Sequence, residues 1–173
     1  MNAESTELPP PPLDLRIYEA LEGAIDIHLH PHPDSSPRLL NDLEAAAQAK
    51  AVGMRAISIK CHASSTPDRA YIAEQAVGGG IKVFGILCLN PAIGGLNPEA
   101  VRMAIRMGAK GIWATSMTDH EVQYVRRSRA LMGAETMGMT YPEKGITIFD
   151  DDGRIKPEVV DIIKDVAEAD IML

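Results

Sequence analysis

The chain has 173 residues, 46% of them hydrophobic and only 4% aromatic, so we expect one domain with a core of aliphatic side chains and methionine. Its formal net charge of −7 argues against binding to nucleic acid or to an anionic membrane, because both attract basic surfaces. No apolar run reaches the ~20 residues that span a bilayer, which argues against a membrane protein.

The first 13 residues predict a flexible arm, because the run Pro9–Pro12 favours an extended polyproline conformation. The start of the chain, M-N-A-E-S-T-E, has neither the basic nor the apolar region of a signal peptide. The two cysteines, Cys61 and Cys88, are isolated from each other and fit free thiols in a reducing compartment. We therefore expect a cytoplasmic protein.

After a short helix at 14–22, short apolar runs alternate with helical patterns. Prolines at the first turn, such as Pro37, Pro67 and Pro98, mark the helix starts. The expected strands are 24–29, 55–60, 81–88 and 110–115, and the expected helices are 37–52, 66–77, 97–107 and 119–131. This alternation predicts right-handed βαβ units and a parallel sheet.

Residues 133–156 interrupt the pattern, and we expect a small hairpin or an irregular excursion there, with a turn at 150–153. A helix at 157–169 then leads into 170–173, which resemble the first residues of a fifth strand. The phrases K-A-V-G-M-R-A-I and R-M-G-A-K-G-I form a weak repeat that is typical of (β/α)8 barrels. Because a complete TIM barrel takes about 250 residues, we expect residues 14–173 to form an incomplete one, with four to five α/β units.

The most unusual stretch of the sequence is D-I-H-L-H-P-H-P-D at 26–34. His28 and His30 are two residues apart on a predicted strand, so both side chains point to the same face. They lie at the carboxyl end of the strand, where barrel enzymes place their sites. Two imidazoles there favour a divalent metal: zinc first, with manganese, iron or nickel as alternatives. Asp26 then becomes a candidate for orienting one of the histidines.

His32 lies beyond Pro31 and is either a third metal ligand or a loop histidine that contacts substrate. The alternative for the whole cluster is a polar strand end with solvated histidines. Packing alone does not readily explain two histidines on one face at the end of an apolar strand, and we therefore favour the metal site.

The other predicted strands also end in polar residues. The second gives Lys60 and His62, the third gives Asn90, and the fourth is followed by Thr115, Thr118, Asp119 and His120. A lysine at the end of an apolar strand can act as a base, a nucleophile or an anchor for an anion, or else extend into solvent. His62 and His120 are candidate catalytic bases or ligands, and Asn90 is a candidate substrate contact. Trp113 lies inside a strand and is expected in the core.

The stretch from Ile25 to Asp34, with its H-x-H pattern, resembles the first-strand signature of the amidohydrolase superfamily and related metal-dependent barrels. Three segments together resemble, over about 20–173, an uncharacterised amidohydrolase-like family, DUF6282: D-I-H-L-H-P-H-P-D, S-I-K-C-H and L-N-P-A-I-G-G-L-N-P-E-A-V. The resemblance implies a (β/α)8 barrel with one or two divalent metals that activate water, and it makes His28 and His30 the first two ligands. Lys60 belongs to the second predicted strand, so the carboxylated lysine that the superfamily carries on its fourth strand does not transfer to it.

These observations lead us to expect a metal-dependent hydrolase that cleaves a C–N, C–O or P–O bond of a small molecule. One alternative is a metal-dependent lyase or decarboxylase on the same scaffold. Another is a truncated, non-catalytic fragment that binds metal or serves in assembly. Open edges of a partial barrel would need to be covered, so we also expect a homo-oligomer.

Overall fold

The computed structural model describes residues 15–118, 122, 124 and 144–173. The predicted arm at 1–13 and most of the helix predicted at 119–131 lie outside these residues.

Helices and strands alternate through the described part of the chain, as the sequence predicts. The elements are α1 (Leu15–Leu21), β1 (Ile25–Leu29), α2 (Asp42–Ala51), β2 (Ala56–Ile59), α3 (Pro67–Ala76), β3 (Lys82–Cys88), α4 (Pro98–Arg106), β4 (Gly111–Trp113) and α6 (Pro157–Glu168). A short 3-10 helix, Pro91–Ile93, follows β3. None of the described helices is long and apolar enough to cross a membrane.

One predicted boundary is wrong. We expected a helix from residue 37, but α2 begins at Asp42 because Asn41 is its N-cap. The Asn41 side chain accepts a hydrogen bond from the Glu44 backbone, and the Glu44 side chain accepts one from the Asn41 backbone. This reciprocal pair satisfies two backbone donors at once and fixes the helix start. The residues before it form a loop above the end of β1.

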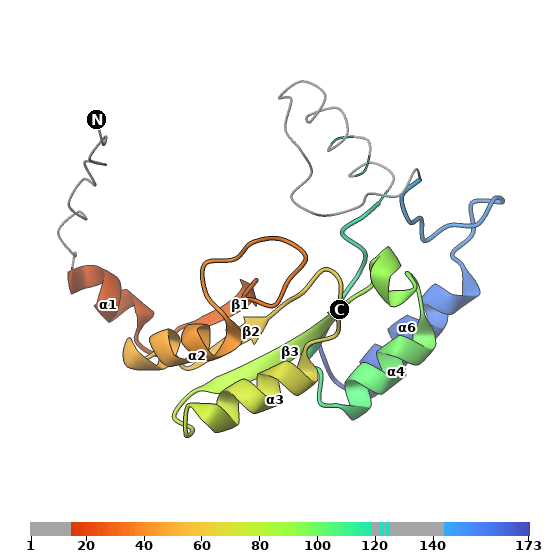
Figure 1. Cartoon of the computed structure of the whole chain (residues 1–173). Helices are drawn as coiled ribbons and strands as arrows, with labels where there is room; N and C mark the ends of the chain where they lie inside the picture. Colours follow the sequence, from red (N-terminus) through yellow and green to blue (C-terminus); the bar gives the residue numbers. More distant parts are fainter. Residues whose placement is uncertain (1–14, 119–121, 123, 125–143) are drawn as a thin grey trace, which may run out of the picture.

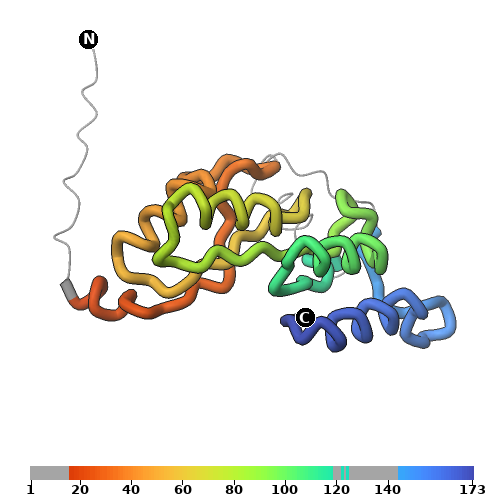
Figure 2. The backbone as a smooth tube through the Cα atoms, turned by 90° about the horizontal axis from the view of Figure 1, so that it is seen from below, coloured from red at the N-terminus to blue at the C-terminus, as the bar shows by residue number. Residues whose placement is uncertain are grey.

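The strands form one parallel sheet in the order β1-β2-β3-β4. Figure 1 shows the sheet curling, with α2 and α3 together on one side of it and α4 farther along. Met172 continues the order, because its backbone pairs in parallel with Gly111 of β4. Figure 2 shows α1 at one end of the molecule and α6 at the other. The sheet is therefore a curled, parallel half-barrel.

Two clusters of small and aliphatic side chains hold the helices on the sheet. In the first, alanines of α2 and α3 (such as Ala46 and Ala73) pack against Ile57 and Ile59 of β2. In the second, Val101 of α4 and Ile162 of α6 pack around β3 and β4. Small side chains let a helix approach a sheet closely, which explains how a core with so few aromatic residues is filled.

Thr66 and Gly85 join β2, β3 and α3. The Thr66 hydroxyl lies 2.7 Å from the Ile59 carbonyl oxygen and 2.9 Å from the Ile86 carbonyl oxygen, and it accepts a hydrogen bond from the Ile86 backbone N–H. A Cβ at Gly85 would overlap the backbone of Pro67, so only glycine fits there. This junction holds the carboxyl ends of the central strands in place.

Residues 144–156 contain the expected small hairpin, since Phe149 and Ile155 form an antiparallel bridge. The Asp150 carboxylate accepts hydrogen bonds from the backbone N–H groups of Asp152 and Arg154, which closes the turn. The acidic run D-D-D-G is thus a turn whose first aspartate binds its own backbone.

Candidate active site

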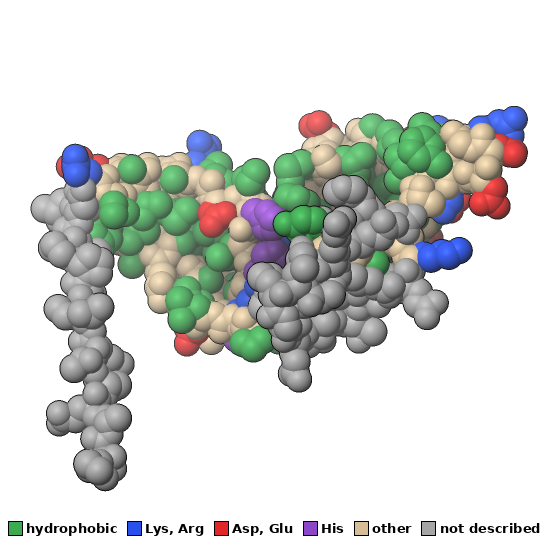
Figure 3. Space-filling view, turned by 90° about the horizontal axis from the view of Figure 1, so that it is seen from above, with side chains coloured by type: hydrophobic (Ala, Val, Ile, Leu, Met, Phe, Trp, Pro, Cys, Tyr) green, Lys and Arg blue, Asp and Glu red, His purple; other side chains and the backbone are tan. Residues whose placement is uncertain are grey.

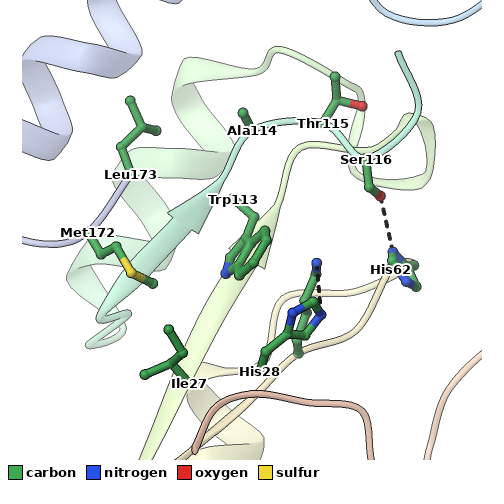
Figure 4. Close-up of a pocket in the computed structure, with 10 residues that line it drawn as sticks. Ile27, His28, His62, Trp113, Ala114, Thr115, Ser116, Met172 and Leu173 are labelled. Atoms are coloured by element: carbon green, nitrogen blue, oxygen red, sulfur yellow. Dashed lines mark hydrogen bonds between the residues drawn. The ribbon is translucent and has the colours of Figure 1, made fainter. Parts of the chain in front are cut away.

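The carboxyl ends of the strands converge on a cavity of about 670 Å³. Figure 3 shows histidine side chains gathered in the middle of the molecule, and Figure 4 shows the lining of the cavity at close range. Its polar and aromatic lining comes from three strand ends: His28, Lys60, His62, Trp113, Thr115 and Ser116. The structure therefore brings the polar strand ends together, as expected for a parallel sheet that curls.

His28 and His30 lie side by side, with their Nε2 atoms 3.0 Å apart. Burial, and then the charge of Lys60, lowers the pKa of His28. Burial lowers the pKa of His30 to about 4, with further contributions from the charges of His62 and Arg38. Both imidazoles are thus neutral at neutral pH, the state in which a ring nitrogen offers a lone pair.

Asp34 lies next to the other nitrogen of His30, at 3.7 Å from Nδ1 to Oδ2, and its side chain is fully buried. Arg38 Nε donates to Asp34 Oδ2 at 2.7 Å and holds this carboxylate in place. His30 Nδ1 is buried and has no hydrogen-bond partner among the described residues. A small rotation of either side chain would let His30 Nδ1 donate a hydrogen bond to the Asp34 carboxylate. This bond would direct His30 Nε2 toward His28.

Asp26, the residue expected to orient one of the histidines, has a different role in the structure. Asp26 Oδ1 accepts a hydrogen bond from the backbone N–H of His28 at 2.8 Å, so it fixes the backbone of the strand end. Asp34 was overlooked because its approach to His30 depends on the path of the loop, which the alternation of strand residues does not predict.

His32 is placed apart from the histidine pair. Its Nε2 accepts a hydrogen bond from the Arg38 backbone N–H at 2.9 Å, and its ring lines a separate groove beside Asp42 and Arg69. That nitrogen is already occupied by the loop, so in this arrangement His32 supports the loop and offers no Nε2 lone pair to a shared metal.

Lys60 points into the cavity and is only 2% exposed. Its Nζ lies 3.4 Å from His28 Nε2 and 3.8 Å from the centre of the Trp113 ring. Burial lowers the pKa of Lys60. The lysine therefore does not extend into solvent from the strand end.

Trp113 lines the cavity, which corrects our expectation that it belongs to the core. Its ring centre is 4.7 Å from that of His28, and its buried Nε1 has no hydrogen-bond partner among the described residues. Trp113 is the last residue of β4, and the curl of the sheet turns its side chain toward β1.

His62 stacks on His30 with ring centres 4.6 Å apart. Its Nδ1 lies 3.3 Å from Ser116 Oγ, the contact that Figure 4 marks. Burial, and then the charge of Lys60, lowers the pKa of His62. A neutral imidazole beside the histidine pair is well placed to accept a proton.

Asn90 is fully buried, and its amide ties neighbouring loops together. Its Nδ2 lies 3.2 Å from the His62 carbonyl oxygen, while its Oδ1 accepts from the Ser116 backbone at 3.1 Å and from the Thr115 hydroxyl at 3.2 Å. The amide is thus used within the chain, so Asn90 positions His62 and Ser116 and does not offer free groups to a substrate. The sequence does not predict the position of Ser116, because one serine after a strand carries no distinctive signal.

Comparison with protein families matches residues 23–173 to a family of unknown function, DUF6282. The chain belongs to this family. No curated protein and no solved structure matches the chain. Membership in DUF6282 thus confirms one part of the resemblance, while these comparisons provide no link to the amidohydrolase superfamily.

This DUF6282 chain presents two neighbouring imidazoles without a complete ligand set in its described part. Among residues 15–118, 122, 124 and 144–173, no group of three or more His, Cys, Asp or Glu side chains is arranged to hold a metal ion. His120, the other predicted candidate, lies outside these residues. The predicted metal therefore stays a prediction, and His28 and His30 remain its candidate ligands among the described residues.

Proposed function

We propose that this chain is a metal-dependent hydrolase of the amidohydrolase type, built on a (β/α)8 barrel, in which His28 and His30 hold a divalent metal. The observation that carries the proposal is the 3.0 Å distance between their Nε2 atoms. Two nitrogens that are each ~2.0–2.1 Å from a zinc ion stand about 3–3.4 Å apart, so both rings can share one ion with little movement. The lowered pKa values of His28 and His30 favour the neutral, metal-binding form.

The surroundings of His30 also fit a metal ligand. Metal-binding histidines usually donate their second ring N–H to a carboxylate or carbonyl, and buried Asp34 stands near His30 Nδ1 in that position. Zinc suits such imidazole ligands best, and manganese, iron and nickel also bind them. Further ligands would come from outside the described residues, where His120 is the candidate.

A divalent metal bound at this place would supply a water that loses its proton near neutral pH and attacks a C–N, C–O or P–O bond. The chain's own residues then have distinct tasks. His28 and His30 hold the ion, and His62, neutral and fixed by Ser116, accepts or returns a proton as general base and acid. The substrate is a small molecule, since the cavity measures about 670 Å³.

A lyase or decarboxylase on the same scaffold is the second candidate. It is supported by Lys60, whose buried Nζ reaches the cavity beside His28 and could hold a carboxylate. The two buried thiols, Cys61 and Cys88, are not in a disulfide and support the further proposal that the protein works in the cytoplasm.

Elemental analysis of untagged protein tests the metal site. Wild-type protein is loaded with zinc, freed of excess metal and compared with the His28→Ala/His30→Ala double variant and with His32→Ala as the matched control. We expect near-stoichiometric metal in wild type and His32→Ala and its loss in the double variant, with circular dichroism showing that all three fold. A folded wild-type protein that retains no metal would contradict the proposal and favour a non-catalytic role.

A further inference from the structure

Lys60 is a buried amine that has no anionic partner among the described residues. It is 2% exposed, and no ion pair joins it to any carboxylate of the described residues. The cavity that receives its Nζ is lined, within the described part of the chain, by no aspartate or glutamate. Burying an unpaired cation is costly, so this arrangement is favourable once an anion from outside occupies the cavity.

The hydrogen bonding of Lys60 depends on His28. Its polar neighbour in the described part of the cavity is His28 Nε2, at 3.4 Å, the same atom that the proposed metal site uses. If His28 Nε2 binds a metal, its lone pair is no longer available to Lys60. The amine then has its donors free beside the reaction centre.

The ring of Trp113 provides an apolar wall in the same cavity. Its Nε1 is buried and lacks a hydrogen-bond partner among the described residues. Figure 4 shows the nitrogen edge of its ring turned toward the side where Ile27 and Met172 lie. These two side chains line the cavity and are 56% and 42% exposed. One end of the cavity is therefore cationic and the other is apolar.

We propose that the cavity binds a small molecule that carries an oxyanion on an apolar body. Lys60 holds the oxyanion, and the apolar body lies against Ile27 and Met172. That this molecule is the substrate rests on the proposed function, whereas its binding does not. An oxyanion at Lys60 lies next to His28, so the bond that reacts would be close to the charged group of the substrate.

The chain contains one tryptophan, so the fluorescence of Trp113 reports on this cavity alone. The full chain, freed of metal by a chelator, is titrated with phenylacetate, with phenyl phosphate and with the neutral amide phenylacetamide. We expect a saturable change with at least one anion and binding at least about tenfold weaker for the amide, as the loss of a charge-assisted hydrogen bond implies. The two anions distinguish a carboxylate from a phosphate site.

Lys60→Met should weaken binding of the anion by about tenfold or more. Lys110→Met, which removes an exposed lysine just before β4, should leave it unchanged. Equal binding of acid and amide by wild-type protein, or no binding of either anion, overturns the proposal even if Lys60→Met fails to fold. The titration is free of metal, so its result is independent of the elemental analysis. A protein that binds the anion but no metal would contradict only the proposed hydrolase. A protein that binds metal but no anion would contradict only this inference.

Discussion

His30 is held as a neutral imidazole by its surroundings. Burial lowers its pKa to about 4, and His62 and Arg38 add to the effect, whereas the unfolded chain has the ordinary value of about 6.5. Between these two values the unfolded state binds the proton more readily than the folded state. Above about pH 6.5 the ring is neutral in both states, so it does not lower the free energy of unfolding. As the pH falls toward 4, protonation favours the unfolded state, and the free energy of unfolding decreases.

We expect the metal-free protein to lose stability steadily between about pH 6.5 and pH 4. Urea unfolding at a series of pH values measures this loss, and His30→Asn should reduce its slope because the titrating ring is gone. His28 and His62, whose pKa values are also lowered, should keep part of the slope. An identical slope in wild type and His30→Asn would show that His30 does not have a depressed pKa.

Asp34 and Asp26 allow a matched comparison, since both carboxylates lie beside the histidine pair. Asp34 faces His30 Nδ1, while Asp26 accepts from a backbone N–H, a task that an asparagine oxygen can also perform. We expect Asp34→Asn to weaken zinc binding about 10- to 100-fold and Asp26→Asn to change it little. Competition with a zinc-binding dye measures the zinc affinity of both variants. If the two substitutions change this affinity equally, Asp34 does not orient His30.

The sequence predicts the shared face of His28 and His30, because strand geometry alone sets the side on which residues two apart lie. It does not predict that Asp34 approaches His30 or that His32 turns to the Arg38 backbone. Both depend on a loop whose path is set by contacts with α2. The role of Asn90 is missed for the same reason: its partners, Thr115 and Ser116, follow a different strand.

At the scale of elements, Thr66 links β2, β3 and α3 through one hydroxyl group. Thr66→Val keeps the shape but leaves buried backbone groups of Ile59 and Ile86 without this partner, so we expect a loss of about 2–3 kcal/mol in unfolding free energy. Thr66→Ser keeps the hydroxyl and should lose about 1 kcal/mol through the missing methyl group. Urea unfolding measures the free energy of unfolding of both variants. Equal losses in Thr66→Val and Thr66→Ser would mean that packing, and not hydrogen bonding, accounts for the stabilising effect of Thr66.

The order of elements is predictable because the apolar runs and the helix signals repeat along the chain. A buried strand such as β2 tolerates few residues that are not apolar, so it stands out in the sequence. The start of α2 was misplaced because Pro37 and Asn41 are both acceptable start signals. The choice of Asn41 comes from the loop above β1, where His32 pairs with Asn41 across an isolated bridge.

At the scale of the whole molecule, the half-barrel leaves one edge of its sheet without a neighbour in the described part of the chain. Among the described strands β1 pairs with β2 alone, and Ile25 and Ile27 are 49% and 56% exposed. Such an edge offers unpaired backbone groups and apolar side chains to another chain. The predicted homo-oligomer stays a prediction, and this edge is where a second copy would bind.

Hydrogen exchange followed by mass spectrometry tests that prediction strand by strand. In dilute protein the amides of buried β2 and β3 should exchange slowly and those of β1 quickly, because β2 and β3 have a strand on both sides, whereas β1 has one on a single side among the described residues. At a protein concentration about 100-fold higher, β1 should become protected as a second copy covers its edge. Ile27→Lys should abolish this gain, whereas Ile163→Lys, on the exposed side of α6, should not. Rapid exchange of β1 at every concentration would show that the edge stays open and that the oligomer prediction is wrong.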